Sequence, residues 1–298
     1  MQSPDLVDQA ILPWDSWETY GTNPQWGMVD LPEKPWSLVV VQGDTRTASR
    51  AAVWAYEQGI PVFHLEAGVR TYDLASPWPE EGYRQMISRI ATYHACTTQQ
   101  NLKLLDGEGL FRRFDDSRIT GSPIVESVRE RSKVALTKAP AIPYVVVTLH
   151  RRENRGHFAD ILNGVSDAIG KEVGYSWFGH PNGWAVQECD NGMNHQPPLN
   201  AVDFAAVLRD AACVVTDSGG VQEESCCLGT PCVVARSTTD RPESLGKGGA
   251  ILAGTSREGV AKAIREALQM DRYAIQRDIF GDGKASERIV DWWQEIVG

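Results

Sequence analysis

One stretch of the sequence has the residue types and spacing that suit binding of a phosphate or diphosphate. The apolar run Cys213–Thr216 leads into a turn at Ser218–Gly220, and helix-compatible residues continue to Leu228, which predicts a strand, a tight turn and a helix. Glycines at a helix start let backbone N–H groups approach an anion, and the Ser218 hydroxyl is a further donor. Glu224, about two turns into this helix, can accept hydrogen bonds from ribose hydroxyls. The pattern fits equally well a plain strand-to-helix turn with a capping serine.

Other polar side chains cluster just after predicted strands, in both halves of the chain. In the first half these are Asp44, Glu66, Glu80, Glu81 and Arg84. In the second half they are His150, Arg151, Asn154, His180, Arg236 and Asp240. Because parallel strands end at the same edge of a sheet, we expect these side chains at one cleft. Carboxylates that share a cleft can serve as general acid and general base when their environments separate their pKa values.

Each of these residues also has a purely structural interpretation. Asp44 can be a helix N-cap, Glu80 and Glu81 can complement a helix dipole, and the arginines after His150 can be solvated loop charges. For any single residue the structural role is the more frequent one, but their joint occurrence at strand ends in both halves favours a site. Four other histidines have no such context and are interpreted as structural, namely His64, His94, His157 and His195.

The elements that would hold these residues are strands and helices in alternation. We predict strands over 38–42, 61–65, 94–97, 118–120, 144–148, 175–178, 213–216, 232–235 and 250–252. Helices are predicted over 45–58, 81–93, 99–105, 124–134, 158–169, 203–208, 219–228, 257–268 and 286–296. Repeated strand–helix–strand units imply parallel sheets covered on both faces. Residues 1–36 differ, because five prolines and four tryptophans predict a loop-rich segment with one short helix over 6–11.

A proline-bracketed stretch at 138–143 is the predicted linker. We therefore expect an N-terminal domain over 1–137 and a C-terminal domain over 143–274, with a C-terminal helix within 275–298 that can pack back on the first domain. The predicted fold class is α/β, with two Rossmann-like doubly wound domains and a ligand cleft between them.

The composition excludes several classes of protein. With 298 residues and a formal net charge of −10, the chain is large enough for two domains and too acidic for a nucleic-acid or anionic-membrane partner. Its six cysteines have no metal-ligand or disulfide spacing, so we interpret them as small buried residues in a reducing compartment. The N-terminal residues show no leader pattern, and no apolar run reaches membrane-spanning length, which predicts a cytoplasmic protein.

Seven motifs together resemble those of the non-hydrolysing UDP-N-acetylglucosamine 2-epimerases. They are GDT at 43–45, HLEAGVRT at 64–71, SPWPEE at 76–81, HRREN at 150–154, GHPN at 179–182, DSGGVQEE at 217–224 and TDRPE at 239–243. They occur in the family's order and extend over most of the chain from Val39 onward. The resemblance implies a fold of the glycosyltransferase-B type and interconversion of UDP-N-acetylglucosamine (UDP-GlcNAc) and UDP-N-acetylmannosamine (UDP-ManNAc), with no nicotinamide, metal or other cofactor.

The resemblance also implies a role for each candidate residue. Asp44, Glu66 and Glu80 would be the acid/base set, and His150 would lie beside the departing diphosphate. The residues that would bind the substrate are Arg84, Arg151, His180, Ser218, Gly219, Gly220, Glu224 and Arg236. Among them the serine and the first glycine would hold the phosphates, the glutamate would bind the ribose, and Arg236 would add positive charge. A homodimer is the expected assembly.

The sequence departs from the family pattern in three places. The family's initial Gly-Thr-Arg-Pro-Glu motif has no counterpart, so we expect an incomplete first domain that lacks one strand–helix–strand unit. The segment 183–198 is irregular, and Asp240 stands where the family has glutamate. Two alternatives therefore stay open. One is a UDP-sugar-binding homologue with impaired catalysis, and the other is a transferase of the glycosyltransferase-B type.

Overall fold

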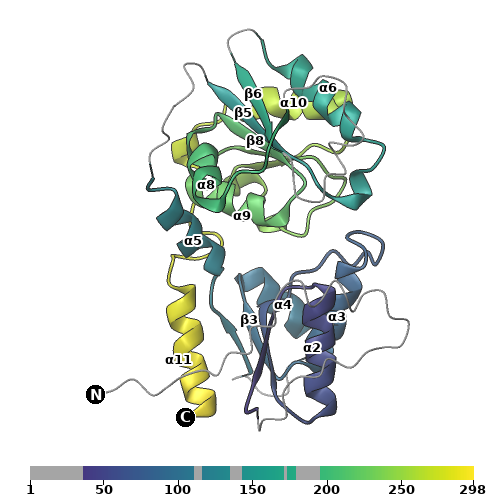
Figure 1. Ribbon diagram of the computed structural model, residues 1–298, viewed down its shortest axis with the longest axis vertical. Coiled ribbons are helices and arrows are strands. Elements are labelled where there is room, and N and C mark those ends of the chain that lie inside the picture. The colour runs from purple at the N-terminus through teal and green to yellow at the C-terminus, as the bar shows by residue number, and fades with distance from the viewer. Residues whose placement is uncertain (1–35, 111–115, 135–142, 171–172, 179–194) are drawn as a thin grey trace.

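The structure is a computed structural model that describes residues 36–110, 116–134, 143–170, 173–178 and 195–298. Two parallel β-sheets, each with its own helices, lie one above the other (Figure 1). We call the sheet β1–β4 with its helices the first half, and the sheet β5–β10 with its helices the second half.

The first sheet is built from strands that neighbour one another in chain order, and every pair of neighbours is parallel. Its strands are β1 (Val39–Gln42), β2 (Val62–Ala67), β3 (Tyr93–Cys96) and β4 (Ser117–Ile119). The helices between them are α2 (Arg46–Glu57), α3 (Glu80–Ile90) and α4 (Gln99–Gly107). Because all strands run the same way, the loops that follow β1 and β2 leave the sheet at the same edge.

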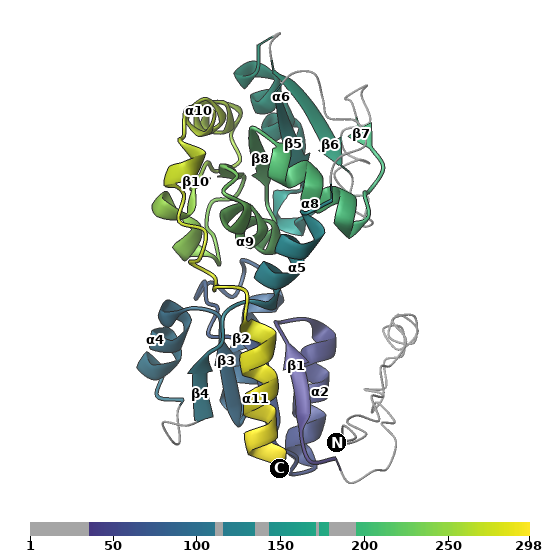
Figure 2. The same ribbon diagram turned by 90° about the vertical axis from the view of Figure 1, so that its left-hand side faces the viewer.

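Side chains of the first sheet alternate between two helical layers. Val62 packs with Ile87 of α3, whereas Phe63 faces the C-terminal helix α11 (Ala285–Val297). The rings of Phe63 and Trp292 meet edge to face, with their centroids 4.8 Å apart. Figure 2 shows α11 lying along this sheet, although in sequence it follows the last helix of the second half.

The second sheet is parallel and has the order β10-β9-β8-β5-β6-β7. Its strands are β5 (Tyr144–Thr148), β6 (Gly174–Phe178), β7 (His195–Gln196), β8 (Cys213–Thr216), β9 (Cys232–Val234) and β10 (Ala250–Leu252). The main helices are α6 (Phe158–Ala168), α8 (Ala201–Asp210), α9 (Gly219–Leu228) and α10 (Arg257–Ala267).

The strand order reverses between β5 and β8, which are neighbours in the second sheet. The chain passes from β5 out to β7 and then returns to β8 on the other side of β5. The helices after these two strands lie on opposite faces, because Phe158 of α6 packs with Ile264 of α10 while Cys227 of α9 packs with Leu208 of α8. Such a reversal opens a crevice at the carboxyl ends of the two strands, where ligands of this fold class bind.

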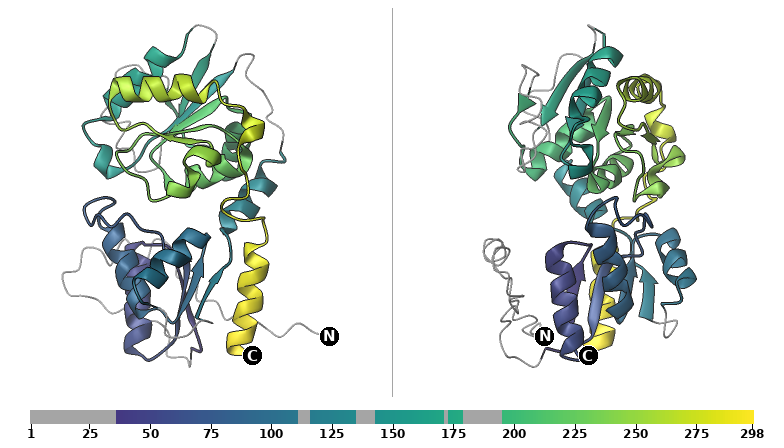
Figure 3. Two further views of the ribbon diagram at one scale, coloured as in Figure 1. Left: turned by 180° about the vertical axis from the view of Figure 1, so that it is seen from behind. Right: turned by 90° about the vertical axis from the view of Figure 1, so that its right-hand side faces the viewer.

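Two segments join the halves. The helix α5 (Pro123–Arg131) follows β4 of the first sheet, yet its Val125 and Val128 pack in the core of the second half. The C-terminal segment passes in the opposite direction, from α10 down to α11, as Figure 3 shows from behind. The domain limits of 1–137 and 143–274 remain a prediction.

Within the described residues the predicted strands and helices are confirmed, with shifts at their ends. The helix predicted over 81–93 ends at Ile90, because Tyr93 already belongs to β3. The short strand β7 was not predicted, since two residues are too few to show a periodic pattern. The predictions for residues 1–35, 138–142 and 183–194 lie outside the described residues.

Five cysteines are buried and form no disulfide, namely Cys96, Cys213, Cys226, Cys227 and Cys232. This agrees with their interpretation as small buried residues, and Cys189 lies outside the described part of the chain. Among the described helices, none combines the length and the hydropathy that crossing a bilayer requires.

Candidate active site

Asp217 holds two loops together at the point where the second sheet reverses. It directly follows β8 and is fully buried, and its carboxylate accepts hydrogen bonds from the backbone N–H groups of His150 at 3.0 Å and Arg151 at 2.9 Å. The side-chain amide of Asn154 donates a further bond at 3.0 Å. Burial raises the pKa of Asp217, while these donors oppose the shift. The loop after β5 is thereby fixed against the turn after β8, and the imidazole Nδ1 of His150 lies 3.3 Å from the Asp217 carboxylate.

A cavity of about 320 Å³ opens beside these two loops. Its lining residues are Thr148, His150, Phe178, Pro198, Leu199, Phe204, Ser218, Gly220, Val221 and Glu224. Four of the predicted site residues therefore share one cavity. The rings of Phe178 and Phe204 meet edge to face at 6.4 Å, so the cavity joins aromatic walls to a few polar groups, as small-molecule sites commonly do.

Ser218 stands at the N-cap position of α9, but its side chain makes no capping hydrogen bond. The interpretation as a capping serine is therefore wrong, and Ser218 lines the cavity. Glu224 lies further along the same helix, and burial raises the pKa of its carboxyl group to about 7. Both residues line the cavity, with Ser218 at the positive end of the helix.

In the first half, Glu66 has a backbone conformation unlike that of its neighbours in β2. Its φ of 61° is unusual for a residue other than glycine, and the pairing of β2 with β3 shifts register between Leu65 and Ala67. The bulge turns the Glu66 side chain toward Gln42, whose amide donates to it at 2.7 Å. Burial and the Glu223 carboxylate raise the pKa of Glu66 above its usual value, against the effect of a nearby arginine.

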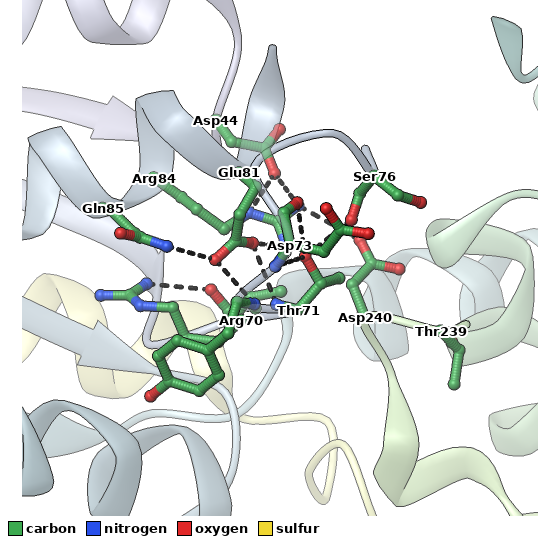
Figure 4. Close-up of polar contacts among 12 residues, drawn as sticks. Asp44, Arg70, Thr71, Asp73, Ser76, Glu81, Arg84, Gln85, Thr239 and Asp240 are labelled. Atoms are coloured by element: carbon green, nitrogen blue, oxygen red, sulfur yellow. Dashed lines mark hydrogen bonds and ion pairs between the residues drawn. The ribbon is translucent and has the colours of Figure 1, made fainter. Parts of the chain in front are cut away.

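Asp44 is paired with an arginine rather than used as a helix cap. Thr45 caps α2 by accepting a bond from the Ala48 N–H at 3.1 Å, so the interpretation of Asp44 as an N-cap is wrong. The Arg84 guanidinium donates from Nε to Asp44 at 2.9 Å, and its Nη2 contacts both Asp44 and Asp240 (Figure 4). Since Asp240 belongs to the second half, Arg84 connects the two halves.

The two glutamates at the start of α3 have different surroundings. Glu81 is fully buried and accepts hydrogen bonds from the backbone N–H groups of Thr71 at 3.0 Å and Tyr72 at 3.1 Å, and from the Gln85 amide at 2.8 Å. These hydrogen bonds fix the loop before α3 against the start of the helix. The Glu80 carboxylate is half-buried and has no hydrogen-bond or ion-pair partner within the described residues, so it is free to meet a ligand.

The Asp240 carboxylate forms ion pairs with three arginines, which come from both halves. Arg236 Nη1 lies 2.9 Å from its carboxylate, Arg84 Nη2 lies at 3.2 Å, and Arg241 Nη1 lies at 3.4 Å. Burial alone would raise the pKa of Asp240, but the guanidinium groups, Arg241 foremost, hold it well below its usual range. Asp240 is therefore an anion that organises positive charge beside the crevice.

The glycine turn lies against this charge cluster. A Cβ atom at Gly219 would come within 3.4 Å of the Asp240 carboxylate and 3.6 Å of the Arg241 guanidinium carbon. Arg241 in turn lies 3.5 Å from the Glu66 carboxylate through its Nη2. The turn of the second half and the carboxylates of the first half are thus connected through two residues, and a side chain at position 219 would crowd the space between them.

Two further arginine donors near this cluster are not used by the protein. The Nε of Arg151 and the Nη2 of Arg236 are buried, and neither has a hydrogen-bond partner among the residues that the structure describes. Buried N–H donors of this kind suit an anionic ligand. The described residues contain no cluster of His, Cys, Asp and Glu that could hold a metal ion.

Sequence reasoning found most of these residues but not all. The structure brings Asp44, Glu66 and Arg84 close to the glycine turn, whereas His180 lies outside the described residues. It adds Asp217, Glu223 and Arg241 as organising charges, and the walls formed by Phe178 and Phe204. Their sequence signals were weak, because an aromatic residue at a strand end or in an amphipathic helix has the pattern of an ordinary core residue.

The chain has clear relatives among known proteins. A family model described as UDP-N-acetylglucosamine 2-epimerase matches residues 31–294. The chain is 33% identical to the UDP-N-acetylglucosamine 2-epimerase of Salmonella typhimurium and 31% identical to that of Escherichia coli K12, over 85% of this chain and 74% of each relative. It is also similar to the crystal structure of the Methanocaldococcus jannaschii UDP-GlcNAc 2-epimerase in complex with UDP-GlcNAc and UDP, with a TM-score of 0.78 and 29% identity over 87% of this chain and 76% of that one.

Proposed function

The chain belongs to the UDP-N-acetylglucosamine 2-epimerase family, and from this premise we propose that it interconverts UDP-GlcNAc and UDP-ManNAc by elimination and re-addition of UDP. The observation that carries the proposal is the contact chain from Gly219 through Asp240 and Arg84 to Asp44. It connects acidic side chains of the first half with the glycine turn of the second half, which would bind the diphosphate.

The reaction needs two proton transfers on opposite faces of the sugar. A base removes the C2 proton, the electron pair forms the C1–C2 double bond, and the C1–O bond to the diphosphate breaks. UDP then adds back at C1 while an acid gives a proton to C2 from the other face. Asp44, which is paired with Arg84, is suited to the role of base, and the buried Glu66 to that of acid. Glu80 is the third member of the set.

The second half would bind the UDP group. The apolar walls at Phe178 and Phe204 suit a planar base, and Glu224 can accept hydrogen bonds from ribose hydroxyls. The diphosphate would lie at the start of α9, where backbone N–H groups and the unused donors of Arg151 and Arg236 are available. His150 would stand beside the departing diphosphate and stabilise its charge.

Proton NMR in heavy water tests this function. With UDP-GlcNAc as substrate, we expect signals of UDP-ManNAc to grow in and deuterium to enter at C2 of both sugars. Absence of both changes, in a protein that binds UDP by calorimetry, would contradict epimerisation and support the alternative of a catalytically impaired UDP-sugar-binding homologue.

We also propose a cytoplasmic location and a homodimer. The five buried cysteines without disulfides suit a reducing compartment, and the dimer is an expectation from the family resemblance. Sedimentation at several protein concentrations would test the assembly, and a single monomer species at every concentration would contradict it.

A further inference from the structure

A buried chain of contacts leads from the helix α9 to the Glu66 carboxylate. Glu223 lies on α9 and is almost fully buried, and the Ser122 hydroxyl donates to its Oε2 at 2.7 Å. The Nε of Arg241 donates to the other oxygen of Glu223. The far end of the same guanidinium, Nη2, lies 3.5 Å from Glu66. Arg241 is therefore shared by Glu66 of the first half and Glu223 of the second, and its Nη1 also lies 3.4 Å from Asp240.

Glu223 lines neither the cavity nor the turn that would hold the diphosphate. Its side chain points to Arg241 and Ser122, so it has no direct place among the groups that would touch a substrate. It nevertheless adds a second negative charge beside Glu66 and engages the guanidinium that Glu66 otherwise shares only with Asp240. A charge in this position affects how readily Glu66 gives up a proton.

We propose that Glu223 is a positioning residue for Glu66: it holds Arg241 in place and competes for its charge, and thereby keeps Glu66 protonated as the acid that delivers a proton to C2. This inference rests on the proposed epimerase function. The other groups that face Glu66 are Gln42, which donates to it, and Asp44, which adds a weaker negative charge. Neither engages Arg241. Asp240 does, but its carboxylate is also shared with Arg84 and Arg236, so Glu223 is the group whose removal frees the Nε end of the Arg241 guanidinium.

The test is the pH profile of kcat/KM for the wild type and for Glu223→Gln. The pair of catalytic carboxylates loses its last proton in the basic limb of the profile, and that limb belongs mainly to Glu66. Without the Glu223 charge, Arg241 is shared only between Glu66 and Asp240 and interacts more strongly with Glu66. We therefore expect the basic limb to move down by about one pH unit, a tenfold loss in proton affinity. Glu223→Asp keeps the charge and should keep most of the wild-type limb.

Glu243→Gln is the matched control. Glu243 also joins the halves, because its carboxylate accepts hydrogen bonds from the Thr98 hydroxyl at 2.6 Å and from the Asn101 side-chain amide at 3.1 Å. It does not contact Arg241, so its loss should leave the basic limb in place. A limb that stays fixed in Glu223→Gln, or moves equally in Glu243→Gln, would overturn the proposal and leave Glu223 with a purely structural role.

A second measurement separates this inference from the epimerase function itself. Carbon-13 NMR of glutamate carboxyl groups, with the Glu66 signal assigned by its loss in Glu66→Gln, reports the titration of Glu66 without turnover. Saturating UDP keeps the variants folded during this titration. We expect Glu66 to titrate about one pH unit lower in Glu223→Gln. If the titration of Glu66 is unchanged in Glu223→Gln, the inference is contradicted even in an active enzyme. A titration shifted to lower pH supports it even if no epimerisation occurs.

Discussion

The two halves of the molecule contribute to the cleft in different ways. The first half supplies charged side chains, since Asp44, Glu66 and Arg84 all project from its strand ends and from the helix α3. The second half supplies a glycine turn at a helix start and an aromatic-walled cavity next to a buried Asp217. Under the proposed function, we expect the first half to move protons and the second half to hold the nucleotide.

This division teaches that catalysis and binding should be separable by mutation, except at the residues that join the halves. Arg84 with Asp240 and Arg241 with Glu66 are ion pairs that cross between them, beside the hydrogen bonds of Glu243. A change on one side should alter one property, and a change at a crossing pair should alter the folded state itself. The following expectations run from the largest effect to the smallest.

Asp44→Asn should reduce kcat by about 10²–10⁴-fold, because an amide cannot accept the C2 proton. The UDP Kd should stay within about twofold of the wild type, since the nucleotide lies on the other half. Epimerisation rates from NMR and UDP titration by calorimetry measure the two quantities. Equal losses in rate and in affinity would show that catalysis and UDP binding are not separated between the two halves.

Asp240→Asn should lower the free energy of unfolding by about 3–5 kcal/mol, because it leaves three buried arginines without their shared anion. Urea unfolding at pH 7 measures this loss. Asp167→Asn is the control, since the ion pair of Asp167 with Arg257 is exposed and screened by solvent, so its loss should change the stability little.

The Asp240 effect also has a defined pH dependence. The pKa of Asp240 in the folded protein lies below its ordinary value of 3.8, so the carboxylate stabilises the fold fully above that value. The contribution is lost as the pH falls through 3.8 toward the folded pKa. The difference in stability between wild type and Asp240→Asn should therefore shrink in acid, and a difference that grows in acid would contradict the pairing.

Phe204→Ala should weaken UDP binding by about tenfold, because it removes one aromatic wall of the cavity. At saturating substrate kcat should remain close to that of the wild type, the reverse of the result for Asp44→Asn. Tyr273→Ala serves as the control, since that ring is 92% exposed and should not affect the UDP Kd. A fall in kcat at saturation would place Phe204 in the chemistry instead.

Because of Glu224, the affinity for UDP should change a few-fold with pH. Its carboxyl pKa is raised to about 7 in the free protein, and ribose hydroxyls that donate to the carboxylate favour its ionised form. UDP binding should then release a proton, and affinity should rise between pH 6 and pH 8. The UDP phosphate titrates in the same range, so calorimetry on Glu224→Gln supplies the baseline. If UDP affinity depends on pH in the same way in the wild type and in Glu224→Gln, this role is excluded.

The sequence by itself determined the alternation of strands and helices, the parallel sheets and the identity of most polar residues at the cleft. These features depend on short-range patterns, such as apolar runs, helix periods and glycine turns, which neighbouring residues express directly. The turn at Ser218–Gly220 and the acids at Asp44 and Glu66 were found in this way.

Only the tertiary structure decided how these residues work. The bulge that gives Glu66 a positive φ, the pairing of Arg84 with Asp240 and the link from Glu223 through Arg241 all depend on contacts between distant parts of the chain. A charged residue has the same appearance in a sequence whether it is solvated or buried in an ion pair. Its energetics are set by the dielectric and the partners that folding brings to it, which no local pattern records.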